Sequence, residues 1–406
     1  MQMKKGLVCS LVAITACFSL VSAFAEERLD APYGLSEGNE ELLLSGLRNL
    51  SSHELDSALV DLKQLTERRP DFRLAQLVYA DILAAQAQGE PLSSVKANSH
   101  QKKIDGLISE AKVRLLMEME KPAADMLPAD MLKLSASQKH AIVVDTRLSR
   151  LFLFENRDGV PVLIKDFYAS YGRGGIGKEK RGDLKTPVGV YFITSRLEDE
   201  NLPPRYGSGA LPLNYPNVWD KRLGRTGSGI WLHGSPVETY SRPPKASEGC
   251  ISLTNPDFID LDTQINFQNT PVLVGHNIRW IHKKDWLAQS DRFNNLIERW
   301  AADWESLDHQ RYIGNYASAY DDGKRTFKQF ASYKKRVNAN KQFIDIGVND
   351  LSIYRYPDNP DLVVATFEQD YRSSNLQGRS VKRQYWTFED NRWRIAYEGK
   401  PSRGTP

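Results

Sequence analysis

Apolar residues in the first third of the chain recur at helical spacing. Three such stripes run over Leu55–Leu65, Leu74–Ala85 and Ile104–Met119, and proline or glycine follows the first two. Ser51–Glu54 has the pattern of a capping box at the start of the first helix. This pattern predicts a helical domain over residues 26–133 that serves for packing or docking rather than catalysis.

The pattern changes at about Ser135 to short β-type runs. These are Ala141–Asp145, Leu151–Phe154, Val162–Tyr171 and Val188–Thr194, and helical periodicity is absent until after Pro256. The middle of the chain, residues 137–275, is therefore predicted to be a mainly β domain.

The last third begins with helical spacing and ends with strands. Trp286–Trp304 carries an aromatic stripe on one face, and Asp308–Tyr320 is expected to form a second helix. Four strands are then predicted, over Phe343–Val348, Leu362–Phe367, Val381–Phe388 and Trp393–Tyr397, with a turn at residues 389–391 between the last two. Residues 280–400 thus read as an α+β domain, and the whole chain as a multidomain α+β protein.

Composition excludes one class of partner. The 406 residues contain 54 Lys and Arg against 51 Asp and Glu, and this near balance gives no basis for nucleic-acid binding. The length is that of two or three domains.

The N-terminus has the features of an export signal. Lys4 and Lys5 precede an apolar run that ends in Ala23-Phe24-Ala25, so residues 1–25 are predicted to be a signal peptide. Lipid attachment at Cys17 and an uncleaved membrane anchor are the two alternatives. In each case the protein is expected to be exported, and its predicted location is the periplasm.

After signal removal, Cys250 is the one remaining cysteine. Cysteines of exported proteins normally pair, so a lone thiol is either buried and inert or retained for its reactivity. Cys250 follows a glycine and begins an apolar run, while His233 ends another one. A histidine within hydrogen-bond reach activates a thiol, so the two are candidate base and nucleophile.

The segment Gly172–Glu179 satisfies two phosphate-binding patterns but is not predicted to bind phosphate. Both patterns require a helix to begin there, and Gly182 and Pro187 disfavour one. We interpret it as a flexible basic loop whose Arg173, Lys178, Lys180 and Arg181 are available to carboxylates, or as a solvated turn.

Three ordered motifs resemble the L,D-transpeptidase catalytic domain family of bacterial cell-wall enzymes. They are Thr186–Tyr191 (T-P-x-G-x-Y), His233-Gly234, and Ser247–Leu253 (S-x-G-C-I-x-L). The resemblance implies that Cys250 is the nucleophile, with His233 as its base oriented by the carbonyl of Gly234. It also implies that the amides of Gly249 and Cys250 form the oxyanion hole.

In this family the thiol attacks the L-centre carbonyl of the third residue of a peptidoglycan tetrapeptide stem. D-alanine leaves, and the thioester passes to an amine, which gives a 3-3 cross-link, or to water, which trims the stem. Many members read S-H-G-C-x-R, whereas Glu248 and Ser252 stand here at the His and Arg positions. Substitute substrate-binding residues are predicted from proximity in sequence, namely Ser247, Arg242, Lys245 and Arg173.

The C-terminal pattern resembles the nuclear transport factor 2-like fold. A cell-wall cysteine domain followed by this fold resembles the L,D-carboxypeptidases of curved bacteria. The predicted function is therefore an L,D-transpeptidase, with L,D-carboxypeptidase as the close alternative and an inert peptidoglycan-binding scaffold as the third reading. No metal or other cofactor is expected. The helical and C-terminal domains are candidate docking sites for periplasmic proteins, and the sequence gives no oligomeric state.

Overall fold

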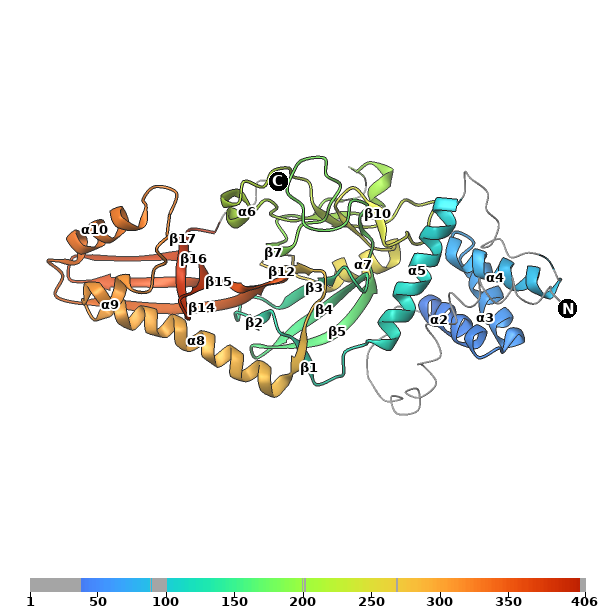
Figure 1. Cartoon of the computed structure of the whole chain (residues 1–406), viewed down its shortest axis with the longest axis horizontal. Coiled ribbons are helices and arrows are strands. Elements are labelled where there is room, and N and C mark those ends of the chain that lie inside the picture. Colours follow the sequence, from blue (N-terminus) through green and yellow to red (C-terminus); the bar gives the residue numbers. More distant parts are fainter. Residues whose placement is uncertain are drawn as a thin grey trace.

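The computed structural model describes residues 38–401, except residues 88, 90–100, 199, 201 and 268. The predicted signal peptide, residues 1–25, lies outside the described residues. Within the described part, no helix is long and apolar enough to span a membrane. The molecule is elongated, with the N-terminal helices at one end and the C-terminal sheet at the other (Figure 1).

Four helices form the N-terminal part of the described chain. They are α2 (Asn39–Ser51), α3 (Leu55–Arg68), α4 (Arg73–Gln86) and α5 (Gln101–Met119). Their apolar faces meet in one core that includes Leu43, Leu62, Leu65 and Leu74. The helices predicted from periodicity are confirmed as α3, α4 and α5, whereas α2 was not predicted. The predicted capping box was wrong, because Ser51 is the last residue of α2 and its hydroxyl donates to the Arg48 carbonyl.

The central domain is built on a five-stranded sheet with the order β5-β4-β3-β12-β7. β3 and β12 are parallel, and the other neighbours are antiparallel. Its strands are β3 (His140–Asp145), β4 (Arg150–Arg157), β5 (Val160–Tyr168), β7 (Gly189–Phe192) and β12 (Pro271–Gly275). Both faces of this sheet are buried, because Ile142 and Val144 point into one core while Ala141 and Val143 point into another.

Short elements cover the first of these cores and carry the motifs. A three-stranded sheet has the order β11-β9-β8, and a two-stranded one pairs β10 with β6. The bounds are β6 (Tyr171–Gly172), a 3-10 turn η3 (Pro204–Tyr206), β8 (Ala210–Pro212), α6 (Val218–Arg222), β9 (Trp231–His233), β10 (Lys245–Ser247), β11 (Ile251–Ser252) and α7 (Asn255–Gln264).

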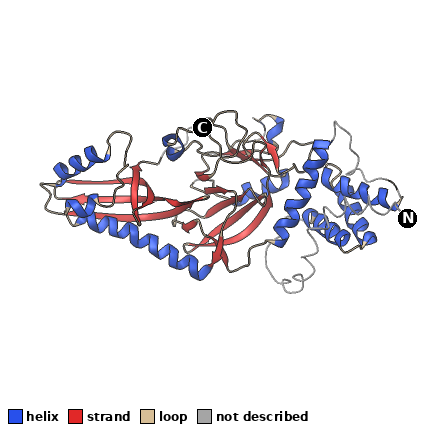
Figure 2. Cartoon of the chain, in the orientation of Figure 1, coloured by secondary structure: helices blue, strands red, loops and turns tan. Residues whose placement is uncertain are grey.

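The C-terminal domain combines a long antiparallel sheet with helices (Figure 2), and residues of these helices and of the strands share one apolar core. Its elements are β13 (Trp280–His282), α8 (Lys283–Glu305), α9 (His309–Ile313), α10 (Phe327–Asn338), β14 (Ile344–Tyr356), β15 (Asn359–Ser373), β16 (Leu376–Glu389) and β17 (Arg392–Gly399). All four predicted strands are present, and each is longer than predicted. The second predicted helix, Asp308–Tyr320, is shortened to α9, and α10 was not predicted.

Residues 126–133 differ from the sequence-based assignment to the helical domain. They form β1 (Met126–Pro128), which pairs with β13, and β2 (Met131–Lys133), which adds a fifth strand to the C-terminal sheet beside β14. Met131 and Leu132 are fully buried in this arrangement. The segment therefore crosses from the helices to the far domain before the chain returns to the central sheet.

The central and C-terminal domains share a continuous apolar core. It joins Phe152 and Leu273 of the central sheet to Tyr354 and Val364 of the C-terminal one. Trp219 of α6 stacks on Tyr385 with ring centroids 5.1 Å apart. An interface of this kind holds the two domains in a fixed relation.

Buried charges join the helices to the central domain. Arg150 on β4 binds Glu40 on α2 at 2.7 Å and Asp166 on β5 at 2.5 Å. Arg114 on α5 binds the same Glu40 at 2.9 Å and Glu110 at 2.9 Å. Although burial alone would raise it, the pKa of Glu40 is lowered to about 2 by the two guanidinium groups. These five side chains, called here the interdomain charge cluster, are almost fully buried.

We expect Arg150→Met to destabilise the protein by about 3–5 kcal/mol, because it leaves Asp166 as a buried carboxylate without its guanidinium partner. Urea denaturation at neutral pH measures the change. Arg372→Met is the matched control, since it removes an ion pair of similar length, 2.6 Å to Asp345, that is exposed; its cost should stay below about 1 kcal/mol. Equal costs for the two variants would contradict a structural role for the cluster.

Candidate active site

The two candidate catalytic residues lie on neighbouring parallel strands. β9 ends at His233, and β11 begins directly after Cys250. The register pairs Ile251 with Leu232 and Ser252 with His233, so Cys250 stands beside Trp231. Because side chains two positions apart share a face of a strand, Cys250 and His233 are on the same face of the pair. The fold thus brings together two residues seventeen positions apart in the sequence.

The imidazole of His233 is held in one tautomer. Its Nδ1 lies 2.6 Å from the carbonyl oxygen of Gly234, which can only accept, so Nδ1 carries the proton and Nε2 is left as the base. The hydroxyl of Ser252 donates to the same carbonyl at 3.0 Å. Burial lowers the pKa of His233 to about 4, so the ring is neutral at physiological pH. This arrangement suits a general base.

Cys250 is buried, with 9% of its surface exposed. Its Sγ lies 3.3 Å from the carbonyl oxygen of Gly229, to which the thiol donates, and it also has a backbone hydrogen bond to Trp231. Burial raises the pKa of the Cys250 thiol to about 11. The resting pair is therefore a neutral thiol and a neutral imidazole rather than an ion pair.

The turn before Cys250 is fixed by the Ser247 side chain. Its hydroxyl donates to the Cys250 carbonyl at 2.5 Å and accepts from the Gly249 amide at 3.1 Å. Gly249 has a φ of +125°, and a Cβ there would lie 2.8 Å from the Lys185 carbonyl oxygen. Only glycine fits this position. Because the Gly249 amide already has a partner, it can serve an oxyanion hole only by exchanging that bond.

Two arginines act on both catalytic residues. The charges of Arg242 and Arg205 lower the pKa of Cys250 against the larger effect of burial, and both also lower the pKa of His233. Arg242 is half-buried and donates to the Ala246 carbonyl, whereas Arg205 is exposed on η3. Glu248 acts in the opposite direction on the pKa of Cys250. Two cations and one carboxylate thus influence the thiol, and the cations would attract a group that carries carboxylates.

Comparisons with known proteins agree with this geometry. Residues 139–274, which contain both His233 and Cys250, match the family model of the L,D-transpeptidase catalytic domain. The central domain is an L,D-transpeptidase-like domain. Residues 292–399 match the model of the Cds6 C-terminal NTF2-like domain. Both resemblances inferred from the sequence are confirmed, as is the multidomain α+β fold class. Among curated proteins, none matches the chain.

Solved structures with similar folds include proteins of two bacteria. Bd1075 of Bdellovibrio bacteriovorus has 26% sequence identity and a TM-score of 0.60, and the match covers 68% of this chain and 99% of that one. Pgp2 of Campylobacter jejuni, described as a helical cell shape determining protein, has 26% identity and a TM-score of 0.56 over 67% of this chain and 95% of that one. A point variant of Pgp2 matches at 25% identity and a TM-score of 0.56, over 72% of this chain and 97% of that one.

The structure separates the residues predicted to bind substrate. Arg242 is placed at the catalytic pair. Ser247 is used to hold the turn. Lys245 is exposed on β10, and no contact links its side chain to the catalytic pair. Arg173 is also exposed, and its guanidinium pairs with Glu248 at 3.1 Å. Glu248 stands at the position where many family members have histidine. It thus forms an ion pair with Arg173 close to the turn.

The prediction that Lys178 is available to carboxylates of a substrate was wrong. Lys178 is buried, and its Nζ lies 2.6 Å from Asp183 Oδ1. Burial would raise the pKa of Asp183, but Lys178 and the amides of Lys180, Glu179 and Lys185 lower it well below its usual range. The loop is therefore organised round its own buried ion pair.

Several residues of the domain were not found from the sequence. Tyr206 packs edge-on against the His233 ring with centroids 5.1 Å apart, and it also contacts Trp231. Asn255 accepts from the amides of Ser208 and Ser235, which shapes the loop after His233. A Pro-Arg-Tyr run is too common to single out, so the sequence offered no signal for Arg205 or Tyr206.

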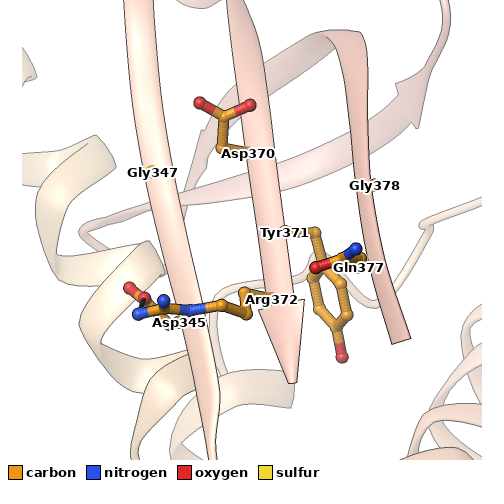
Figure 3. Close-up of a pocket in the computed structure, with 7 residues that line it drawn as sticks. All are labelled: Asp345, Gly347, Asp370, Tyr371, Arg372, Gln377 and Gly378. Atoms are coloured by element: carbon orange, nitrogen blue, oxygen red, sulfur yellow. Dashed lines mark hydrogen bonds and ion pairs between the residues drawn. The ribbon is translucent and has the colours of Figure 1, made fainter. Parts of the chain in front are cut away.

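A hollow lies on the C-terminal sheet, away from the catalytic pair (Figure 3). Asp345, Asp370 and Arg372 are among the residues that line it. Its charges are already paired, Asp345 with Arg372 and Asp370 with Arg379. Tyr312, Tyr316, Trp300 and Trp304 pack into the domain core. In the described residues, no group of histidine, cysteine and acidic side chains is placed to hold a metal ion.

We expect the Cys250 thiol to ionise at a pH well above that of a free cysteine, because burial disfavours the charged thiolate. Ultraviolet thiolate absorbance, taken as the difference from Cys250→Ser, should rise towards pH 11 and stay low at neutral pH. Since the pKa of Cys250 is raised in the folded protein, the side chain is fully protonated below the pKa of a free cysteine. It loses its proton only as the pH rises through about 11. A plateau already reached at pH 7 would show an imidazolium–thiolate pair instead.

Proposed function

We propose that this protein is an exported peptidoglycan-modifying cysteine enzyme of the periplasm. It acts on tetrapeptide stems through a thioester at Cys250, with release of D-alanine. The observation that carries the proposal is the pairing of Cys250 and His233 on adjacent strands, with the imidazole oriented by the Gly234 carbonyl. The family match of residues 139–274 and the description of Pgp2 as a cell shape determining protein support it.

In the first step, Nε2 of His233 takes the thiol proton as Sγ of Cys250 attacks the carbonyl carbon of the third stem residue. The carbon–nitrogen bond to D-alanine breaks, and the imidazolium returns the proton to the leaving amine. A thioester now joins the shortened stem to Cys250. In the second step an amine or a water gives a proton to Nε2, attacks the thioester and releases the thiol, which recovers the same proton.

The choice between amine and water separates two functions. An L,D-transpeptidase passes the stem to the amine of a second stem, whereas an L,D-carboxypeptidase passes it to water. The burial of Cys250 favours the smaller acceptor. Ser252 is uncharged, so it supplies no cation that could hold a second stem. It is also 2% exposed, and its hydroxyl donates to the Gly234 carbonyl. Transpeptidation is the general reaction of the family, and these two observations make trimming the second candidate.

Cys250→Ala is expected to abolish D-alanine release from disaccharide tetrapeptides, and His233→Ala to lower turnover by roughly 100- to 10,000-fold. D-alanine is measured with the purified protein, and circular dichroism verifies the fold of each variant. Ser318→Ala, a surface position of the C-terminal domain, is the control and should retain full turnover. If the parent protein and Cys250→Ala bound peptidoglycan equally and neither released D-alanine, the protein would be an inert scaffold.

Mass analysis of the products identifies the acceptor. We expect tripeptide stems to be detected readily with the parent protein, since water needs no binding site beside the thioester. Adding a large excess of acceptor stems tests for the amine reaction in the same assay. A mixture that contains 3-3 dimers and no tripeptide would exclude the carboxypeptidase and leave transpeptidation as the function.

A further inference from the structure

The chain between His233 and Cys250 is attached to the N-terminal helices at successive residues. The amide of Tyr240 donates to the Asp71 carbonyl at 3.2 Å, and its ring lies 4.7 Å from that of Phe72. The hydroxyl of the next residue, Ser241, donates to Glu110 Oε1 on α5 at 2.5 Å. The partners in these contacts, Asp71, Phe72 and Glu110, all lie before the central domain in the sequence.

The next two residues are held just as closely. The Arg242 carbonyl accepts from the hydroxyls of Tyr168 at 2.8 Å and Ser170 at 2.9 Å. Pro243 packs on α5 so tightly that a Cβ on Gly106 would lie 3.0 Å from its ring. The segment 240–243 is thus clamped between α5 and β5, and Figure 1 shows α5 beside this part of the central domain.

One guanidinium supports both sides of this clamp. Arg114 lies 3.8 Å from the centroid of the Tyr168 ring, and it also binds Glu110, the acceptor of the Ser241 hydroxyl. Arg114 is 3% exposed and belongs to the interdomain charge cluster. The positions of Ser241 and of the Arg242 backbone are therefore tied to how the helices dock.

The clamped segment carries the cation that the active site uses. The Arg242 side chain donates to the Ala246 carbonyl on β10, and its charge acts on both Cys250 and His233. A guanidinium can bind a carboxylate with two parallel hydrogen bonds, and supporting contacts that hold its backbone make the position of such a site precise. Holding the segment thus holds the site at which a carboxylate would bind.

We propose that the N-terminal helical domain positions Arg242 for the substrate. Ser241 and Tyr168 are the positioning residues, and the ligand of Arg242 is a carboxylate of the donor stem beside the bond to be broken. This inference rests on the proposed function for the identity of the carboxylate but not for the placement of the charge. Arg242 is the one residue here that contacts substrate; the others act through it.

The placement of the charge is tested without any stem. Rates of Cys250 alkylation by anionic iodoacetate and by neutral iodoacetamide are measured for the full chain, and their ratio reports the positive field at Sγ. The Arg242→Gln variant gives the reference ratio that is expected when this positive charge is absent. Ser241→Ala and Tyr168→Phe should lower the parent ratio by about three- to tenfold, towards that of Arg242→Gln, because the guanidinium is no longer held near the thiol.

Two variants separate positioning from general loss of structure. Ser241→Thr retains the hydroxyl and should restore the parent ratio. Tyr354→Phe removes another buried tyrosine hydroxyl, bonded to Gln138 at 2.6 Å in the C-terminal sheet, and should leave the ratio unchanged. Ratios for Ser241→Ala and Tyr168→Phe equal to that of the parent would overturn the proposal, as would an equal fall in Tyr354→Phe.

Stem turnover supplies the second readout. Ser241→Ala and Tyr168→Phe should raise the KM for D-alanine release about three- to tenfold with a smaller change in kcat, since binding of the carboxylate is lost while the catalytic pair stays intact. A fall in kcat alone would contradict a role in binding. If the alkylation ratio fell as expected and no variant or parent released D-alanine, the helical domain would still position Arg242 and only the proposed function would fail.

Discussion

The structure depends on Arg114, a buried cation that three parts of the chain share. It contacts Glu40 of α2, Glu110 of its own helix and the ring of Tyr168 on β5. Removing a guanidinium from water costs several kcal/mol, and only close partners on every side offset that cost. The charge can therefore stay buried only when the helices are docked in one orientation. An apolar contact would tolerate sliding, whereas this cluster does not.

The chemistry of the site follows from how its backbone is arranged. A carbonyl oxygen, rather than a carboxylate, orients His233, so no negative charge stabilises an imidazolium at rest. Burial then keeps the imidazole and the Cys250 thiol neutral. In the proposed reaction, the proton would move from thiol to imidazole as the thiol attacks, and the new charges would need donors round the substrate carbonyl. Gly249 matters for the same reason, because its backbone conformation sets the turn that presents Sγ.

The catalytic pair was readable in the sequence because each half is a short local motif. His233-Gly234 and Ser247–Leu253 are each contiguous in the sequence, and regular apolar stripes predicted α3, α4, α5 and α8. Contacts between loops leave no such pattern. Arg205 reaches the site from a 3-10 turn, and Lys178 looked available because its partner Asp183 is recognised only once the loop is folded. Met131–Lys133 is too short for periodicity to show that it joins a distant sheet.

Ser252 stands where many family members have an arginine, so a cation near Cys250 must be supplied by another residue. Its side chain is buried, bonded to the carbonyl that orients His233, and its backbone is bridged to Ser170. A guanidinium placed there would have to leave this packed space to meet a substrate. Arg242 instead approaches from a segment that the N-terminal helices hold, so the charge beside Cys250 belongs functionally to two domains. In the proposed function, recognition of the stem is thereby linked to the docking of the helical domain, while the proposed nucleophile and base remain within the central one.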